Sequence, residues 1–319
     1  MQLATVVIPN LNGKKYLKDC LDALERQTSQ DFSVIMVDNG SADGSAEFVK
    51  ANYPEVAVKR FAENRGFCGA VNEGIRMAKT KYVILLNNDT ICSPSFVEEL
   101  IVGMEARTDC FAGSARMVQM QDPGKMDNCG DFYCALGWAF TPAKGKSIQS
   151  YESARKVFSA CGGAAIYLRR VFDEIGLFDE AHFAYLEDVD VCWRAKIAGY
   201  QNWYFPKAVV KHVGSATSGS VYNEFKVRHS SRNSIYMIYK NMPLLQIILN
   251  LPFLAAGYLT KTLFFIRKGF GALYLQGIWQ GILLCSREKK VKFQWKHLKQ
   301  YGKIQLELWL NLIRRIRDF

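Results

Sequence analysis

Hydrophobic residues recur along the first half of the chain in two alternating patterns. Short apolar runs rich in β-branched and aromatic residues predict strands at residues 4–9, 32–37, 56–61, 82–86 and 110–115. The segments between these runs carry apolar residues at helical spacing, as Leu17, Leu21 and Leu24 do. Because alternating strands and helices build a mostly parallel sheet, the pattern predicts an α/β fold that resembles the Rossmann type.

The pattern changes twice further along the chain. Residues from 117 to about 157 lose their periodicity and contain many glycines, which predicts a long excursion from the sheet of the kind that covers a site. Two strongly apolar runs follow, at residues 244–259 and 269–285, and each contains polar side chains. Both fall short of the roughly 20 apolar residues that span a bilayer. We therefore divide the chain into an α/β domain, residues 1–225, and a helical region that we expect to associate with a membrane, residues 226–319.

The net charge of +11 is distributed unevenly. The first 200 residues hold 22 basic and 26 acidic side chains, whereas residues 201–319 hold 19 basic and only four acidic ones. Apolar helices with cationic and aromatic borders fit the interface of an anionic cytoplasmic leaflet, so we expect a peripheral or monotopic protein at that face of the cell membrane. A helical core with a solvated basic face is the alternative.

Cysteine usage and the first residues agree with a cytoplasmic setting. The nine cysteines form no C-x-x-C pair, so neither a disulfide framework nor a structural zinc site is predicted. The chain opens with a sequence typical of a first strand and not of a signal peptide.

Polar groups follow three of the predicted strands. Asp38 ends the second strand, where a carboxylate can accept hydrogen bonds from a nucleobase or a ribose. A turn that caps the next helix is the alternative. Small residues at 64–74 stand where a helix begins and could bind phosphate, although a tight turn with close helix packing explains them equally well.

The third polar group, Asn87-Asn88-Asp89, ends the buried run 82–86. Mg²⁺ or Mn²⁺ in nucleotide chemistry takes one or two carboxylates together with phosphate oxygens, so Asp89 is a candidate metal ligand. Taken alone, Asp89 would be a helix N-cap or a turn residue.

A fourth segment, residues 178–195, contains five acids among apolar and aromatic side chains. An apolar stripe that starts at Val189 would bury one helical face and leave Glu187 and Asp188 at the helix start. A carboxylate there, beside aromatic residues, suits a general base. Capping of the helix is the alternative, and we prefer it for Asp190.

Six segments, in this order along the first 215 residues or so, resemble the motifs of family 2 glycosyltransferases with the GT-A fold, rhamnosyltransferase-like branch. They are residues 7–13, 37–45, 64–74, 85–90, 178–180 and 185–195. Several linked motifs are more specific than any one of them. The resemblance implies a set of donor-binding residues, namely Pro9 and Asp38 for the base and ribose, with Asn64, Gly66, Asn72, Asn87 and Asn88 along the same cleft.

The resemblance also implies the catalytic and metal-binding residues. Asn87-Asn88-Asp89 occupies the place of the Asp-x-Asp motif, with Asp89 on the metal and Asn87 in place of the first acid. Glu187-Asp188 matches the acidic pair that supplies the base, and Asp188 is the better candidate. His212, at the end of an apolar run, stands where related enzymes place a further metal ligand, although a structural histidine is equally expected there.

The activity implied is metal-dependent, inverting sugar transfer that uses Mg²⁺ or Mn²⁺. The resemblance favours dTDP-rhamnose over a UDP-sugar as donor and suggests a lipid-linked saccharide acceptor in cell-surface polysaccharide synthesis. One rival is a nucleic-acid- or membrane-binding protein with an inactive front domain, but an acidic front repels a polyanion, so no nucleic-acid partner is expected. The other rival, a sugar nucleotidyltransferase, would open with a glycine-rich loop, whereas residues 9–14 contain one glycine.

Overall fold

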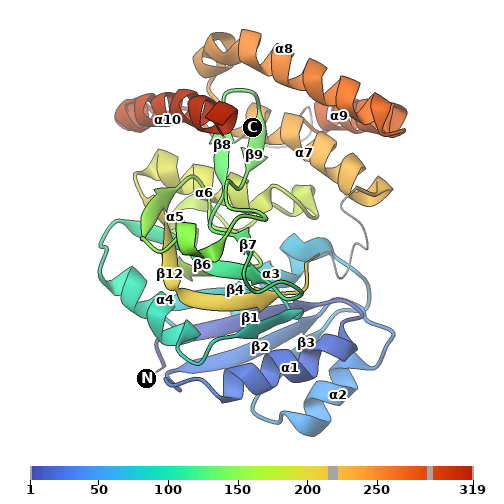
Figure 1. Cartoon of the computed structure of the whole chain (residues 1–319), viewed down its shortest axis with the longest axis vertical. Coiled ribbons are helices and arrows are strands. Elements are labelled where there is room, and N and C mark those ends of the chain that lie inside the picture. The colour runs from blue at the N-terminus through green and yellow to red at the C-terminus, as the bar shows by residue number, and fades with distance from the viewer. Residues whose placement is uncertain (1, 215–221, 286–289, 318–319) are drawn as a thin grey trace.

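The computed structural model describes residues 2–214, 222–285 and 290–317. A large mixed sheet with helices on both faces carries a layer of C-terminal helices at one end (Figure 1). The helices are α1 Lys14–Glu25, α2 Ser45–Asn52, α3 Gly66–Met77, α4 Phe96–Glu105, α5 Val171–Ile175, α6 Glu187–Ala198, α7 Glu224–Asn241, α8 Leu244–Arg267, α9 Gly271–Cys285 and α10 Leu298–Arg317. The strands are β1 Ala4–Asn10, β2 Phe32–Asp38, β3 Ala57–Arg60, β4 Tyr82–Leu86, β5 Thr90–Cys92, β6 Cys110–Gln119, β7 Met126–Asn128, β8 Phe132–Cys134, β9 Trp138–Phe140, β10 Arg155–Val157, β11 Ala164–Leu168 and β12 Gln201–His212.

The main sheet has the strand order β10-β12-β6-β11-β4-β1-β2-β3. Strands β3, β2, β1 and β4 are parallel neighbours, as the sequence pattern predicts. The other half is mixed, because β11 runs antiparallel to both β4 and β6. Every residue of β4 is buried, as expected for a strand covered on both faces. The parallel half therefore brings the ends of β1, β2 and β4 to one edge.

The strands that the sequence missed lie in the mixed half and in a separate two-stranded sheet, β8-β9. Residues 117–157 are not a structureless excursion, because β6 continues to Gln119 and β7 to β10 follow. Strand β12 shows no clean alternation, since its register against β6 shifts between Phe205 and Val209, around Pro206. A proline cannot donate to the ladder and is tolerated in a strand at such irregularities.

The C-terminal helices share a core with the sheet domain. Trp193 of α6 and Tyr133 of β8 belong to the same buried cluster as Met237 of α7, Leu254 of α8 and Leu308 of α10. In Figure 1 the β8–β9 hairpin reaches up from the sheet toward this helical layer. The proposed division at residues 225 and 226 therefore falls within α7, close to its start.

Helix α8 is longer than the sequence predicts. Its apolar run does not end at residue 259 but continues past Lys261, so the helix has 24 residues with a mean hydropathy of 1.4 in its most apolar stretch. The expectation that both apolar runs are too short to span a bilayer is therefore wrong for the first. Among the described residues α8 alone is long and apolar enough, by length and composition, while α9 has 15 residues. Part of the predicted cationic run, Arg287 and Lys289, lies outside the described residues.

Candidate active site

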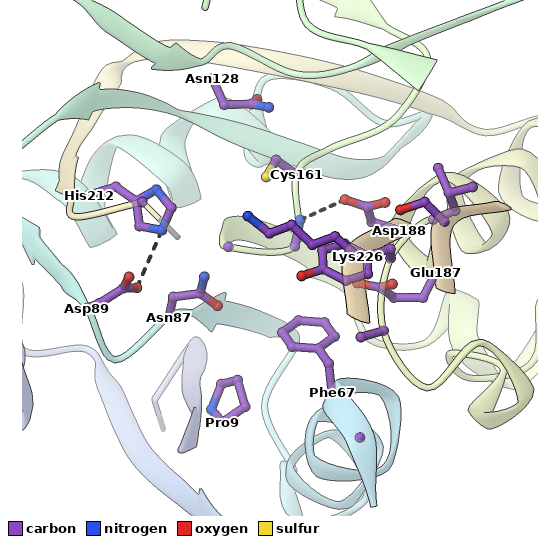
Figure 2. Close-up of a pocket in the computed structure, with 18 of the residues that line it drawn as sticks. Pro9, Phe67, Asn87, Asp89, Asn128, Cys161, Glu187, Asp188, His212 and Lys226 are labelled. Atoms are coloured by element: carbon purple, nitrogen blue, oxygen red, sulfur yellow. Dashed lines mark hydrogen bonds and ion pairs between the residues drawn. The ribbon is translucent and has the colours of Figure 1, made fainter. Parts of the chain in front are cut away.

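A cleft of about 1030 Å³ opens where the strand ends meet the start of α6. One wall, which we call the strand-end wall, carries Pro9, Asn87, Asn88, Asp89 and His212. The opposite wall, which we call the helix wall, consists of residues 183–188 together with Asp131 and Cys161. In Figure 2 Asp89 and Asp188 lie on opposite sides of this one cleft.

Asp89 is held in a turn directly after the buried strand β4. The Thr90 hydroxyl donates to the Asn87 carbonyl (2.6 Å), and the Asn88 amide donates to the side chain of Asn10 at the end of β1 (2.7 Å). Only 6% of Asp89 is exposed. Strand β12 pairs with β5 so that His212 is opposite Thr90, which brings the imidazole to the Asp89 carboxylate. Strand pairing therefore assembles this wall from segments far apart in the sequence.

His212 lies between two carboxylates. Its Nε2 is 3.4 Å from Asp89 Oδ1, and its Nδ1 is 2.7 Å from Asp127 Oδ2. Burial disfavours the charged imidazole, but hydrogen bonds to Asp127 and Asp89 outweigh it and raise the pKa of His212 to about 9. The same histidine lowers the pKa of Asp127 against the opposing effect of burial.

These residues fit a divalent cation that displaces the proton of His212, since metal ligands bind in their deprotonated form. Two ligand atoms of one octahedral ion lie about 3 Å apart, close to the separation of Asp89 Oδ1 from His212 Nε2. A carboxylate on the other imidazole nitrogen, here Asp127, fixes the ring and turns Nε2 toward an ion. No sequence pattern indicates Asp127, which lies on β7 within the residues expected to be an excursion.

Asp188 lies at the first turn of α6 and faces the cleft. Its carboxylate accepts hydrogen bonds from the backbone N–H groups of Gly162 (3.2 Å) and Val189 (2.8 Å). Burial nevertheless raises the pKa of Asp188 above the usual range. Burial and the neighbouring Asp188 raise the pKa of Glu187 to about 8, so Glu187 is mostly protonated at neutral pH. Asp188 is therefore the better base of the pair.

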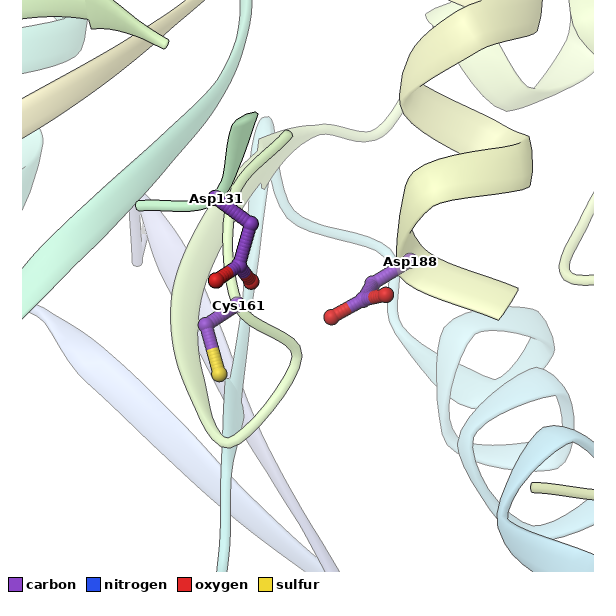
Figure 3. Close-up of side chains that lie close together, drawn as sticks. All are labelled: Asp131, Cys161 and Asp188. Carbon is purple, nitrogen blue, oxygen red and sulfur yellow. The ribbon is translucent and has the colours of Figure 1, made fainter. Parts of the chain in front are cut away.

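Within the helix wall, the side chains of Asp131 and Cys161 face that of Asp188 (Figure 3). One ligand atom from each of the three side chains lies within 4.8 Å of the other two. Burial and the charge of Asp188 raise the pKa of Asp131 to about 7. Burial also raises the pKa of the Cys161 thiol, so it remains protonated and is a poor metal ligand. Asp131 and Asp188 are therefore best described as two neighbouring carboxyl groups, in which the negative charge of one disfavours ionisation of the other. The sequence did not indicate Asp131.

The loop that leads into α6 has an unusual backbone. Phe183, Tyr185 and Leu186 have φ angles of 61°, 72° and 68°. Such values are uncommon for residues other than glycine, and each costs roughly 1–3 kcal/mol unless its surroundings hold it. Gly66 packs against this loop, and a Cβ added there would lie 2.6 Å from Phe183, which explains the glycine at the start of α3.

Helix α7 holds this strained loop. The side-chain amide of Asn233, which is fully buried, donates to the main-chain carbonyls of His182 (2.9 Å), Ala184 (2.8 Å) and Tyr185 (2.7 Å). Arg232 beside it donates to two carbonyls at the start of the loop, at 2.8 Å each. The conformation that presents Glu187 and Asp188 therefore depends on side chains about 50 residues later.

Asp190 points away from the cleft into a buried charge network. It accepts hydrogen bonds from Arg194 on the same helix and from Lys240 (3.1 Å) and Asn241 (2.8 Å) of α7. Lys240 also pairs with Asp179. These contacts give Asp190 a structural role, as preferred from the sequence, although the role is to join α6 to α7.

The remaining donor-binding candidates lie in two places. Pro9, Asn64, Gly66, Asn87 and Asn88 line the cleft. The structure does not bring Asp38 or Asn72 to its wall.

Asp38 and Asn72 are both buried. Asp38 accepts a hydrogen bond from Asn10 (3.0 Å) and lies 3.4 Å from Arg60, which lines a second, smaller cavity of about 370 Å³. Asn72 donates to the carbonyl of Phe178 (2.8 Å) and to Glu180 (3.0 Å), so it fixes the segment before the strained loop.

Comparison with known proteins identifies the class through the fold. The chain is similar to a mannosyltransferase from Pyrobaculum calidifontis in complex with GDP-Man and Mn²⁺ (TM-score 0.55, 16% identity, covering 89% of this chain and 88% of that one). It is also similar to GalNAc-T7 with UDP, GalNAc and Mn²⁺ (TM-score 0.61, 15% identity). That match covers 75% of this chain and 48% of the other. The sheet and its helices therefore form a GT-A fold.

The family follows from the sequence comparison. The profile described as glycosyl transferase family 2 matches residues 5–176, more than half of the chain, so the protein belongs to glycosyltransferase family 2 and transfers a sugar from a nucleotide-sugar. A curated relative from Mycobacterium tuberculosis, N-acetylglucosaminyl-diphospho-decaprenol L-rhamnosyltransferase, is 27% identical over 239 residues, covering 67% of this chain and 77% of its own. Glycosyltransferase GlyG of Streptococcus pneumoniae is 34% identical over 102 residues, covering 31% of this chain and 34% of its own.

Proposed function

We propose that this glycosyltransferase inverts the anomeric centre and moves a sugar, with rhamnose favoured, from a nucleotide-sugar to a hydroxyl of a lipid-linked saccharide. The observation that carries the proposal is that Asp89 with His212 and Asp188 line opposite walls of one cleft. A sugar held between them would have its diphosphate on one side and a base on the other. That arrangement is what a single in-line displacement requires.

The proposed step uses Asp188 as the general base. The Asp188 carboxylate takes the proton of the acceptor hydroxyl while the acceptor oxygen bonds to the anomeric carbon. The bond from that carbon to the diphosphate oxygen breaks on the opposite face, and its electron pair leaves with the nucleoside diphosphate. No covalent enzyme intermediate forms, so one displacement inverts the configuration.

On the strand-end wall, Asp89 and His212 would hold Mg²⁺ or Mn²⁺. Bound there, the ion would supply positive charge to the leaving diphosphate. Asn87 and Asn88 add neutral polar groups beside it. Pro9, Asn64 and Gly66 would contact the rest of the donor. Arg60, which lines the smaller cavity and pairs with the buried Asp38, would receive the base or ribose there. Asn72 would act indirectly, through the segment it fixes.

The acceptor and the location are proposed from the C-terminal helices and from the relatives. Large apolar side chains project from α8, α9 and α10, including Leu245, Ile248, Leu263, Trp279, Leu310 and Ile316, each at least 44% exposed. Surfaces on which many large apolar side chains are exposed together are rare in water and suit a membrane. With the basic groups that border them, they favour association with the anionic cytoplasmic face and a role in surface polysaccharide synthesis.

A donor panel tests the proposal. Detergent-solubilised protein would be incubated with dTDP-rhamnose, UDP-hexoses and GDP-mannose, with Mn²⁺, with Mg²⁺ and with a chelator, and release of the nucleoside diphosphate measured. We expect metal-dependent release from dTDP-rhamnose above all others. Release from a different donor would overturn the sugar assignment, and release unaffected by the chelator would overturn the metal site.

A further inference from the structure

Two groups of aromatic rings, three residues apart in the chain, lie at the cleft and at the apolar helices. Phe225 lines the cleft and contacts Phe183 of the helix wall, with ring centroids 6.2 Å apart. Three residues earlier in the chain, Tyr222 contacts Phe264 (5.6 Å) and Phe265 (5.9 Å) of α8. Phe265 stacks on Tyr274 of α9 at 4.9 Å. We call Phe225, Tyr222, Phe264, Phe265 and Tyr274 the aromatic track.

Three rings of the track are open to solvent. Tyr222 is 44% exposed, Phe225 43% and Phe264 37%, whereas Tyr274 at the far end is buried. The exposed rings of Tyr222 and Phe264 contact each other, which core packing does not explain, and exposed apolar surface of this kind marks a binding site. Beyond Phe264 the track meets the exposed side chains of Leu263 and Ile266 on α8.

Cations lie at two places along the track. Lys226 follows Phe225 and lines the cleft, where Figure 2 places its side chain close to the helix wall. Burial and the charge of Lys144 lower the pKa of Lys226, so an anion beside it would favour its charged form. On α8, Lys268 Nζ is 5.9 Å from the ring of Phe264. A ligand that matches this pattern carries negative charge at the cleft and an apolar chain leading away from it.

We propose that the aromatic track binds a lipid diphosphate, with the hydrocarbon chain along the rings of Tyr222, Phe264 and Phe265 and the diphosphate beside Lys226. The inference rests on the proposed function, because the saccharide of such an acceptor would then lie in the cleft near Asp188. The chain would continue onto the exposed faces of α8 and α9. A peptide or a polynucleotide has no long hydrocarbon chain, so neither would cover both the aromatic rings and the apolar face of α8 beside them.

The test uses binding of a fluorescent, anthranilate-labelled geranylgeranyl diphosphate below its critical micelle concentration. Phe264→Ala and Tyr222→Ala are the test variants, and Phe253→Ala is the matched control. Phe253 lies on the same helix with the same 37% exposure but outside the track. We expect each track variant to weaken binding at least tenfold and the control to stay within twofold of the wild type. Replacing the diphosphate by the free alcohol would also weaken binding, and Lys226→Gln would remove that difference.

Each outcome decides the proposal. Undetectable binding to the wild-type protein, or equal losses for Phe264→Ala and Phe253→Ala, would overturn the track as a lipid diphosphate site. The proposed function fails separately, in the donor panel: a protein that binds the probe through the track but turns over no nucleotide-sugar would keep this site and lose the transferase assignment.

Discussion

The two walls of the cleft are built in different ways. The strand-end wall is positioned by strand pairing, since Asp89 follows β4 and His212 ends β12. The helix wall is positioned by side chains of α7, which hold a loop with positive φ angles at Phe183, Tyr185 and Leu186. The position of Asp188, the proposed base, therefore depends on the C-terminal helices, although Asp188 belongs to the sheet domain. Substitutions in the strand-end wall should therefore weaken metal binding, whereas substitutions in the helix wall should lower kcat.

The largest effect is expected for Asp188→Asn. Because the amide cannot accept the proton, transfer should fall by roughly 10²–10⁴-fold, while donor affinity, set at the strand-end wall, should be unchanged. Single-turnover kinetics and calorimetry with a donor separate these quantities. Asp173→Asn, an exposed acid on α5, is the control. Full turnover by Asp188→Asn would exclude Asp188 as the base.

Asn233→Ala tests how the helix wall is held. Loss of the three hydrogen bonds should release the loop and displace Asp188, which costs about 100-fold in kcat for a shift of about 1 Å. Donor affinity should change little. Asn311→Ala is the matched control, because its buried amide also donates to a main-chain carbonyl, that of Tyr133, which is not part of the loop that leads to Asp188.

The comparison between Asn233→Ala and Asn311→Ala distinguishes positioning from stability. Both variants lose a buried amide, so both should unfold at a lower temperature, but only Asn233→Ala should lower the kcat of the folded protein. Equal kcat values for the two variants would mean that α7 does not position the base.

Asp127→Asn tests the strand-end wall. An amide holds the His212 ring less firmly than a carboxylate, so Mn²⁺ affinity should fall by about 10–100-fold while the helix wall stays intact. Titration of free Mn²⁺ by electron paramagnetic resonance measures the affinity without any substrate. Asp122→Asn, a half-exposed aspartate in the preceding turn, should leave it unchanged.

The smallest effect is expected for Asp131→Asn. The proposed mechanism requires ionised Asp188, whose pKa is raised, so kcat/KM should fall as the pH drops through a value above that of an ordinary aspartate, about 3.9. Because the pKa of Asp131 is about 7, its carboxyl group is mostly neutral over this acid limb, as the introduced amide would be, so the limb should move only slightly and toward lower pH. A shift to higher pH would contradict the described relation between the two carboxylates.

The residues of the cleft also differ in how well the sequence predicts them. Asp89 and Asp188 are marked by local signals, the end of an apolar strand and the start of an amphipathic helix. Asp127 and Asp131 lie in short strands and turns without periodicity, and only pairing with β6 and Ser159 brings them to the cleft. Asn233 reads as an ordinary helical residue, because the loop it holds is defined by backbone angles that no sequence pattern records.

The parallel half of the sheet was predictable for a related reason. Its strands β1, β2 and β4 are mostly buried and are therefore continuous apolar runs in the sequence, whereas the edge strand β3 is largely exposed. Strand β11 is short and rich in alanine, and β12 is interrupted at Pro206, so neither has the pattern of a strand. The length of α8 was underestimated because Lys261 reads as a border when the helix in fact continues to Arg267.

The most direct test is a crystal structure with Mn²⁺ and a non-hydrolysable nucleotide-sugar. The account predicts the ion on Asp89 and His212, the diphosphate beside it, and the anomeric carbon of the sugar turned toward Asp188 across the cleft. A sugar whose anomeric carbon faces away from Asp188, or an ion bound elsewhere, would contradict it.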